Sequence, residues 1–382
     1  MNDLMMAPPT LALDSRQSQS DNLLEQVCIA LQPTEAQYED ATRKYQAVGL
    51  WLSADDSPLR PFAPDIYPQG SMKLGTTNRP WRGEEYDLDI VCQLHGCGHA
   101  HPLDVYEAVY QRMAGNERYR PILERKKRCL RLDYAGNFHM DILPACPDPP
   151  RGGTCVKVPD CELVAWSPSN PLGFAEWFFA RCEITALLEL TEFRKAIRPL
   201  PNPVPSKYKY PLQRIVQLMK RHRDSFFDGN RDAARSVVLT TLAAEAYQGE
   251  ESLLQGLDSI IAVIVRKVES YPGILPVLNP TNRHENFADS WTPETYGQFK
   301  AYLRNFRKHL DQMMRSQGLD VFKIAMSDLF GSGPATQALK AYGLTAQDLR
   351  ERNQVRLTPR SATLTTASAG LAIPRNNFFG RG

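Results

Sequence analysis

The run Tyr86-Asp87-Leu88-Asp89-Ile90-Val91-Cys92 most constrains what this chain of 382 residues can fold into. Acidic and apolar residues alternate along it, and a period of two predicts a β-strand. Asp87 and Asp89 then project from one face of the strand, while Leu88 and Ile90 project from the other. Since an apolar face has to be buried, we expect a sheet with a core on one side and two neighbouring carboxylates on the other.

Two carboxylates on one face repel each other, so the pair indicates either a solvated sheet face or a site for a cation. Oxygen ligands suit Mg²⁺, with Mn²⁺ as the alternative. Asp141 is our candidate for a third carboxylate because it lies in the strand-like run 137–143, while Asp133 in the run 128–134 is a rival. The hairpin signal at 135–136 favours Asp141, since it lets the second run return beside residues 86–92. Three carboxylates can hold two divalent ions for a displacement at phosphorus.

A phosphate-binding turn is predicted upstream of the acidic pair. Gly70 and Ser71 follow an extended run and precede a helix-like segment. Glycine allows close approach of the backbone, and a serine hydroxyl with exposed N–H groups can hold a phosphate. The dipeptide is common in proteins, so its position shortly before a carboxylate pair is what makes it specific.

The chain divides into four predicted segments. Residues 1–33 are expected to be a flexible lead-in. Residues 34–168 begin with a capped amphipathic helix and continue in strand-like runs, which predicts a mixed α/β palm. Residues 169–345 turn to helical periodicity, with candidate helices at 173–190, 210–226, 233–248, 251–270 and 293–317. Residues 346–382 are expected to be a flexible tail that ends in Gly382, because small polar residues, two Pro and terminal glycines characterise residues 355–382.

Composition excludes some functions. The balance of 45 Lys+Arg against 43 Asp+Glu gives a net charge of +2, so any polyanion site has to be local. No run approaches the ~18–20 apolar residues of a membrane helix, and the first residues lack a signal-peptide pattern, so we expect a cytoplasmic protein with reduced thiols. The cluster Cys92–His101 could hold zinc, although its spacing fits no common zinc module.

Two segments are basic. Residues 207–223 contain six Lys or Arg and no acidic residue, which predicts either a solvated helix face or a phosphate-binding surface. Residues 120–131 contain six Lys or Arg against one Glu. They lack interleaved aromatic residues, so we expect a charged strand edge and see no strong case for nucleic-acid binding.

Longer motifs add a resemblance to a known family. Three segments resemble the CD-NTases, the bacterial relatives of cyclic GMP–AMP synthase: YPQGSMKLGT at 67–76, EYDLDIV at 85–91 and MDILP at 140–144. Segments 169–178, 211–223 and 286–291 are also similar to the family. The resemblance covers roughly residues 34–330.

The resemblance implies a DNA polymerase β-like palm with a mixed sheet beside a C-terminal helical domain, with the active site between them. It implies that nucleoside triphosphates are joined into a cyclic di- or trinucleotide for anti-phage defence. By position in the motifs, Asp87, Asp89 and Asp141 would hold two Mg²⁺ and carry the chemistry, with Asp141 also a candidate proton acceptor. The residues expected to contact the donor nucleotide are Gly70, Ser71, Lys220 and Ser236.

The resemblance also implies partners. A downstream effector would read the cyclic nucleotide, and the tail is similar to those that an E1–E2 fusion protein conjugates to targets through a terminal glycine, here Gly382. Two other functions stay open on the same fold. One is a linear product, such as an oligoadenylate or a tailed RNA, and the other is an inactive scaffold module.

Overall fold

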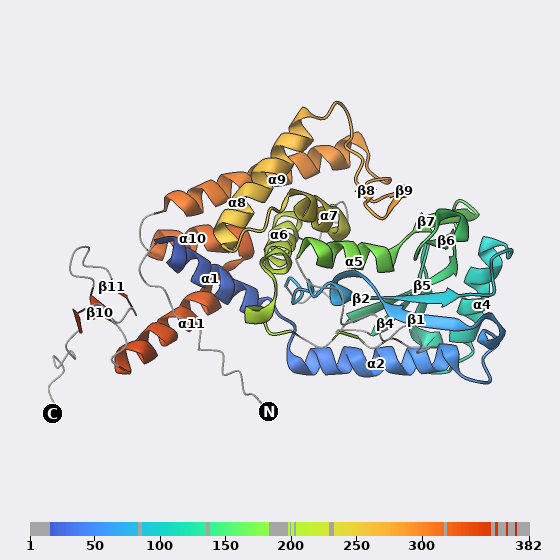
Figure 1. Ribbon diagram of the computed structural model, residues 1–382. Helices are drawn as coiled ribbons and strands as arrows, with labels where there is room; N and C mark the ends of the chain where they lie inside the picture. The colour runs from blue at the N-terminus through green and yellow to red at the C-terminus, as the bar shows by residue number, and fades with distance from the viewer. Residues whose placement is uncertain are drawn as a thin grey trace.

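The structure is a computed structural model that describes residues 16–82, 86–134, 138–182, 198, 200–201, 204–228, 233–316 and 319–352, with three short pieces at 356–357, 364–365 and 371–372. A mixed sheet forms one half of the molecule and a group of helices forms the other (Figure 1). The expected fold class is therefore confirmed.

The sheet half contains α2 (Glu35–Ser53), β1 (Pro64–Pro68), α3 (Gly70–Lys73), β2 (Tyr86–Leu94), α4 (Pro102–Ala114), β3 (Leu123–Arg125), β4 (Leu130–Tyr134), β5 (Phe138–Pro147), β6 (Val156–Asp160) and β7 (Ala165–Ser169). Its strands run in the order β1-β2-β5-β4-β3, and β6 and β7 continue from β5. Only the pairing of β2 with β5 is parallel among the described strands of this sheet. This pairing places Asp89 directly beside Asp141, as the hairpin signal predicted.

The two faces of the central strands differ as the alternation predicted. Leu88, Ile90, Met140 and Ile142 are fully buried in a core that also contains residues of α2 and α4. Helix α2 begins at the capping box of Thr34 with Gln37 and lies along this side of the sheet (Figure 1). The opposite face carries the acidic residues and is turned toward the helices.

The helical half contains α1 (Arg16–Ala30), α5 (Pro171–Arg181), α6 (Pro211–Phe227), α7 (Ser236–Ala246), α8 (Leu253–Ser270), α9 (Pro293–Arg315), α10 (Leu319–Phe330) and α11 (Ser332–Glu351), with the hairpin β8 (Leu278–Asn279) and β9 (Asn282–Asn286). Its core is a single cluster of apolar side chains from these helices. Helices α5, α6 and α7 lie nearest the sheet, and α8 and α9 form the outer layer (Figure 1).

The expected flexible lead-in is wrong for residues 16–30. They form α1, whose Leu23, Leu24, Val27 and Cys28 are buried in the helical core. The polar Ser/Gln run before Leu23 hid this stripe, whose three- and four-residue steps are helical. At the other end, α11 continues to Glu351 and β10 (Arg356–Leu357), β11 (Leu364–Thr365) and β12 (Leu371–Ala372) pair with one another. The predicted tail is therefore not uniformly irregular, and Gly382 lies outside the described residues.

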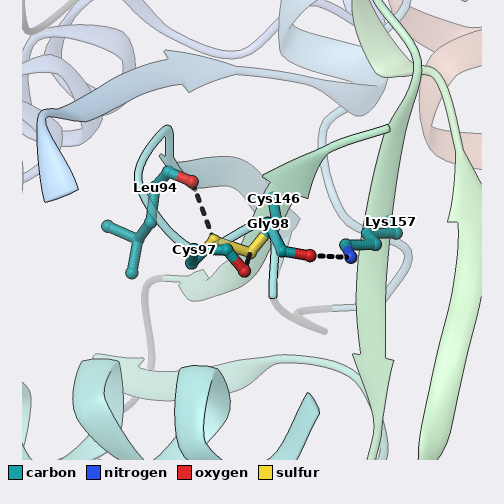
Figure 2. The surroundings of a disulfide bond; sticks show 5 residues. All are labelled: Leu94, Cys97, Gly98, Cys146 and Lys157. Carbon is teal, nitrogen blue, oxygen red and sulfur yellow. Dashed lines mark hydrogen bonds between the residues drawn. A yellow bond between two sulfur atoms is a disulfide. The ribbon is translucent and has the colours of Figure 1, made fainter. Parts of the chain in front are cut away.

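Two cysteines overturn the expectation that all eight thiols are reduced. Cys97, in the loop after β2, is bonded to Cys146 near the end of β5, with 5.9 Å between their Cα atoms (Figure 2). Lys157 of β6 donates a 2.8 Å hydrogen bond to the carbonyl of Gly98, next to the disulfide (Figure 2). The zinc hypothesis is also wrong, because Cys97 is in the disulfide and Cys92 lies fully buried in the apolar core. Among the described helices, none combines the length and apolar character needed to cross a membrane.

Candidate active site

The acidic residues form a row on the polar face of the sheet. Asp87 and Asp89 alternate along β2, Asp141 is the register partner of Asp89 on β5, and Arg131 is the register partner of Asp141 on β4. Strands lie about 4.8 Å apart, so these side chains are neighbours. Arg131 binds Asp141 with both ends of its guanidinium, at 2.7 Å from Nε to Oδ1 and 2.8 Å from Nη2 to Oδ2. Its Nη2 also lies 3.6 Å from Asp87 Oδ1.

The carboxylates of the row disfavour one another's charged forms. The pKa of Asp89 is raised to about 7, chiefly by burial and in addition by the charges of Asp87 and Asp141. A carboxylate with two carboxylate neighbours gains most from a positive charge placed between them. The rival Asp133 lies on the same face, two residues along β4 from Arg131, where its register partner is His139. Its Oδ1 is 3.6 Å from His139 Nδ1.

The glycine–serine turn lies against this row. Gly70 opens α3 with a φ of +63°, and a Cβ at this position would lie 2.2 Å from Asp89 Oδ2. The backbone N–H of Gln69 donates a 2.8 Å hydrogen bond to the carbonyl of Asp89. Only glycine fits here, because it has no Cβ and tolerates the left-handed conformation. The Ser71 hydroxyl accepts a 3.0 Å hydrogen bond from Thr77 Oγ1.

A cleft of about 530 Å³ opens between the sheet and the helices. This is within the ~300–1,000 Å³ typical of small-molecule sites. Asp87, Asp89, Gly70 and Ser71 line it from the sheet half. Its lining residues from the helical half include Lys220, Arg223, Ser236 and Glu285. The structure therefore brings the predicted residues of both halves to one cleft, with Asp141 one strand beyond it.

Lys220 on α6 is buried, contrary to the interpretation of residues 207–223 as a solvated helix face. Its Nζ donates a 3.0 Å hydrogen bond to the carbonyl of Thr76. Burial lowers the pKa of Lys220 to about 8, and the nearby charge of Arg223 acts in the same direction. An ammonium group has three donors, so Lys220 can also meet an anion in the cleft. Ser236 begins α7 as predicted, and its hydroxyl accepts a hydrogen bond from Arg223.

Helix α6 also donates hydrogen bonds to the backbone of residues 74–79, which join the Gly70-Ser71 turn to β2. The sequence did not indicate these contacts. Gln213 Nε2 donates to the carbonyl of Leu74 and Gln217 Nε2 to that of Thr77, both at 2.8 Å. Lys209, just before the helix, donates to the carbonyl of Gly75 at 2.7 Å, and Arg221 donates to that of Arg79. Much of this basic segment therefore binds the backbone at 74–79.

The basic side chains of the second basic segment, residues 120–131, include four that form local ion pairs. The side chains of residues 125–128 each form an ion pair with a nearby acid, the partners being Glu107, Glu124, Glu162 and Asp160 in order. Arg128 also reaches Asp289 of the helical half at 3.4 Å. These charges fit the expectation of a charged strand edge, because β3 is the last strand in the order β1-β2-β5-β4-β3.

The residues present fit a divalent cation. Three carboxylates converge on neighbouring strands, and Arg131 already lies between two of them. Within the described parts of the chain, no three acidic, histidine or cysteine side chains are gathered as a finished metal cage. Carboxylate oxygens are the donors that hard divalent cations prefer, and Asp141 is turned toward a guanidinium.

Comparisons with known proteins agree with this geometry. The nucleotidyltransferase-domain model of the DncV-like cyclic GMP-AMP synthases matches residues 64–144. A c-di-GMP synthase of Roseivirga ehrenbergii is 30% identical over 389 residues, covering 97% of this chain and 100% of the relative. The cyclic dinucleotide synthase CdnG of Bradyrhizobium diazoefficiens is 26% identical over 353 residues, covering 84% and 83%.

Solved structures share the fold. The Bradyrhizobium diazoefficiens CD-NTase CdnG in complex with GTP has a TM-score of 0.68 at 24% identity, covering 85% of this chain and 99% of that one. The Vibrio cholerae DncV cyclic AMP-GMP synthase with a linear intermediate has a TM-score of 0.52 at 13% identity, covering 86% and 94%. Likeness over the full length of a 30% identical relative identifies the protein: this chain belongs to the CD-NTases, the DncV-like nucleotidyltransferases.

Proposed function

We propose that this enzyme joins two molecules of GTP into cyclic di-GMP and releases two molecules of pyrophosphate. The observation that carries the reaction type is that Asp87 and Asp89 line one cleft with the Gly70-Ser71 turn, while Asp141 lies beside Asp89 on the next strand. The relative that matches along its whole length is a c-di-GMP synthase, which supports guanine as the base in both positions. Of the two ring sizes expected from the sequence, a dinucleotide and a trinucleotide, the proposal takes the dinucleotide.

In the proposed reaction, a ribose hydroxyl of one nucleotide attacks the α-phosphorus of the other. The new P–O bond forms as the bond to pyrophosphate breaks, and a second round closes the ring. Asp87, Asp89 and Asp141 would hold two Mg²⁺, and such ions supply positive charge to the attacking and leaving oxygens. Asp141 is the candidate acceptor of the hydroxyl proton, and each of its oxygens also accepts one hydrogen bond from Arg131.

The side chains around the cleft would bind the triphosphate. The N–H groups that open α3 at Gly70 and the Ser71 hydroxyl can donate to phosphate oxygens. From the helical half, Lys220 supplies a charge and Ser236, at the start of α7, supplies a hydroxyl. Since Lys220 is held by the Thr76 carbonyl, its position is fixed before the nucleotide binds.

The wall formed by β7 and the β8–β9 hairpin supports a role in reading the base. Glu285 accepts hydrogen bonds from Ser169 Oγ at 2.9 Å and from Asn279 Nδ2 at 2.7 Å, and all three residues line the cleft. Burial raises the pKa of Glu285. A carboxylate has further lone pairs, so Glu285 can accept from both the N1–H and the exocyclic N–H₂ of guanine. Adenine lacks this adjacent pair of donors, because its N1 is an acceptor.

The test of this function is product analysis. Purified protein incubated with the four NTPs and Mg²⁺ should convert GTP to a phosphatase-resistant cyclic dinucleotide that mass spectrometry identifies. Asp87→Asn with Asp89→Asn should abolish the product while the melting temperature shows a folded protein. Asp133→Asn is the matched control, because Asp133 lies on the same sheet outside the row. Full activity in the double variant, or a linear product from the unaltered enzyme, would contradict the proposal.

A role in anti-phage signalling completes the proposal. The cyclic dinucleotide would activate an effector protein, and an E1–E2 fusion enzyme would conjugate Gly382 to a target. Gly382 lies outside the described residues, so its role rests on the sequence of the tail. Deletion of Gly382 should leave synthesis in vitro intact and block conjugation in cells. Loss of synthesis in this deletion would refute the separation of the two roles.

A further inference from the structure

Arg131, in the sheet half, forms ion pairs with two carboxylates of the acidic row, Asp141 and Asp87. Arg131 is a quarter exposed and its partner Asp141 is 16% exposed, so water screens their contact only in part. The fork of two hydrogen bonds occupies both oxygens of Asp141, while the same guanidinium faces Asp87. Forked contacts between arginine and a carboxylate are strong and fix both partners.

The neighbours of Arg131 along the chain behave differently. The side chains of residues 125–128 pair with acids that lie outside the row of Asp87, Asp89 and Asp141. Arg131 comes from β4, where its register partner is Asp141, so the strand pairing itself directs it to the row. Lys220 approaches Asp87 and Asp89 from the helical half but is anchored on the carbonyl of Thr76.

We infer that Arg131 is a resident counter-ion that holds the place of a divalent ion at Asp141 and has to release this carboxylate before the metal binds there. A guanidinium and a divalent cation both require the negative charge of Asp141, and they repel each other at contact distance. Arg131 is thus a positioning residue: it holds the carboxylates of Asp141 and Asp87 close together and sets the metal concentration at which the site becomes competent.

This inference rests on the proposed function in one respect, since it takes the acidic row as the metal site. Direct metal binding tests the two separately. Mn²⁺ binding without nucleotide is measured by electron paramagnetic resonance for the unaltered protein and for the double variant Asp87→Asn, Asp89→Asn. If the double variant binds Mn²⁺ as the unaltered protein does, the row is not the metal site and the proposed function is wrong.

The variants of Arg131 test the counter-ion. Arg131→Gln keeps a polar side chain without the charge, and its Kd for Mn²⁺ should fall at least about tenfold. Arg125→Gln is the matched control, because Arg125 belongs to the same basic segment but pairs with Glu107, and its Kd should be unchanged. The melting temperature of Arg131→Gln should fall without metal and recover as Mn²⁺ is added, which a merely structural arginine would not produce.

The inference fails if Arg131→Gln binds Mn²⁺ no more tightly than the unaltered protein while the double variant has lost binding. Should Arg131→Gln not fold, Arg131→Lys serves instead, since lysine keeps the charge but cannot form the fork. Its Kd for Mn²⁺ should fall about threefold or more, and an unchanged or higher Kd overturns the inference.

Discussion

Gly70→Ala tests whether the glycine–serine turn and the acidic row form one unit. The added Cβ would lie 2.2 Å from Asp89 Oδ2, against at least 3.4 Å for an ordinary contact, so the carboxylate has to move by more than 1 Å. A displacement of about 1 Å in a catalytic group can reduce the rate about 100-fold. The left-handed backbone adds a cost of about 1–2 kcal/mol in stability. We therefore expect kcat/KM for GTP to fall about 100-fold and stability to fall only modestly.

The control for this prediction is Gly153→Ala. Gly153 also has a positive φ, +55°, but nothing lies within 4 Å of an added Cβ there. Both variants should lose similar free energies of unfolding in urea, since both strain the backbone, while only Gly70→Ala should lose activity. The reasoning is refuted if Gly70→Ala retains more than about a tenth of the activity of Gly153→Ala, because the shift of Asp89 would then not matter to the reaction.

Three further variants test other contacts. Lys220→Met removes one of the cations of α6 and its hydrogen bond to the Thr76 carbonyl. KM for GTP should therefore rise about tenfold or more, with a loss of about 1–3 kcal/mol in stability. An unchanged KM in steady-state kinetics would exclude a phosphate contact. Glu285→Gln replaces one carboxylate oxygen, an acceptor, by an amide N–H₂, a donor, in the wall formed by β7 and the β8–β9 hairpin. Competition assays should show the preference for GTP over ATP reduced about tenfold. An undiminished preference would place base selection elsewhere. His222 stacks on Phe306, and burial lowers its pKa from 6.5 to about 3. Below pH 6.5 the imidazole of His222 is therefore protonated in the unfolded state but not in the folded state. About 2 kcal/mol of stability should be lost between pH 8 and pH 5 in urea titrations, and His222→Gln should lack this loss.

The sequence was sufficient to predict the arrangement of the acidic residues, which side-chain periodicity and strand pairing determine. Asp87 and Asp89 alternate with buried apolar residues, and the hairpin signal correctly returned Asp141 to the side of Asp89. The capping box at Thr34 also has its predicted contacts. These features are local, or follow from the pairing of neighbouring strands, so propensity and pattern determine them.

Features that depend on packing between distant segments could not be predicted in this way. Helix α1 is a helix because its apolar stripe meets α8 and α11 in the helical core, and the polar residues before it gave the opposite signal. Arg131 was visible only as one member of a basic segment, although register on β4 separates it from residues 125–128. Charge counts along the chain cannot distinguish a cation that faces solvent from one that faces the active site.

Helix α6 shows why a basic, polar stripe can belong to the interior. Gln213, Gln217, Lys220 and Arg221 follow the three- and four-residue steps of one helix face, a pattern that usually indicates a solvent-exposed side. Their partners are backbone carbonyls of residues 74–79, and a carbonyl carries no residue identity that the sequence could reveal. Buried carbonyls need donors, so the segment between the phosphate-binding turn and the acidic strand requires such a helix. Lys220 donates to the carbonyl of Thr76 and also lines the cleft. This contact between the two halves of the molecule therefore also fixes a cation where the triphosphate would bind.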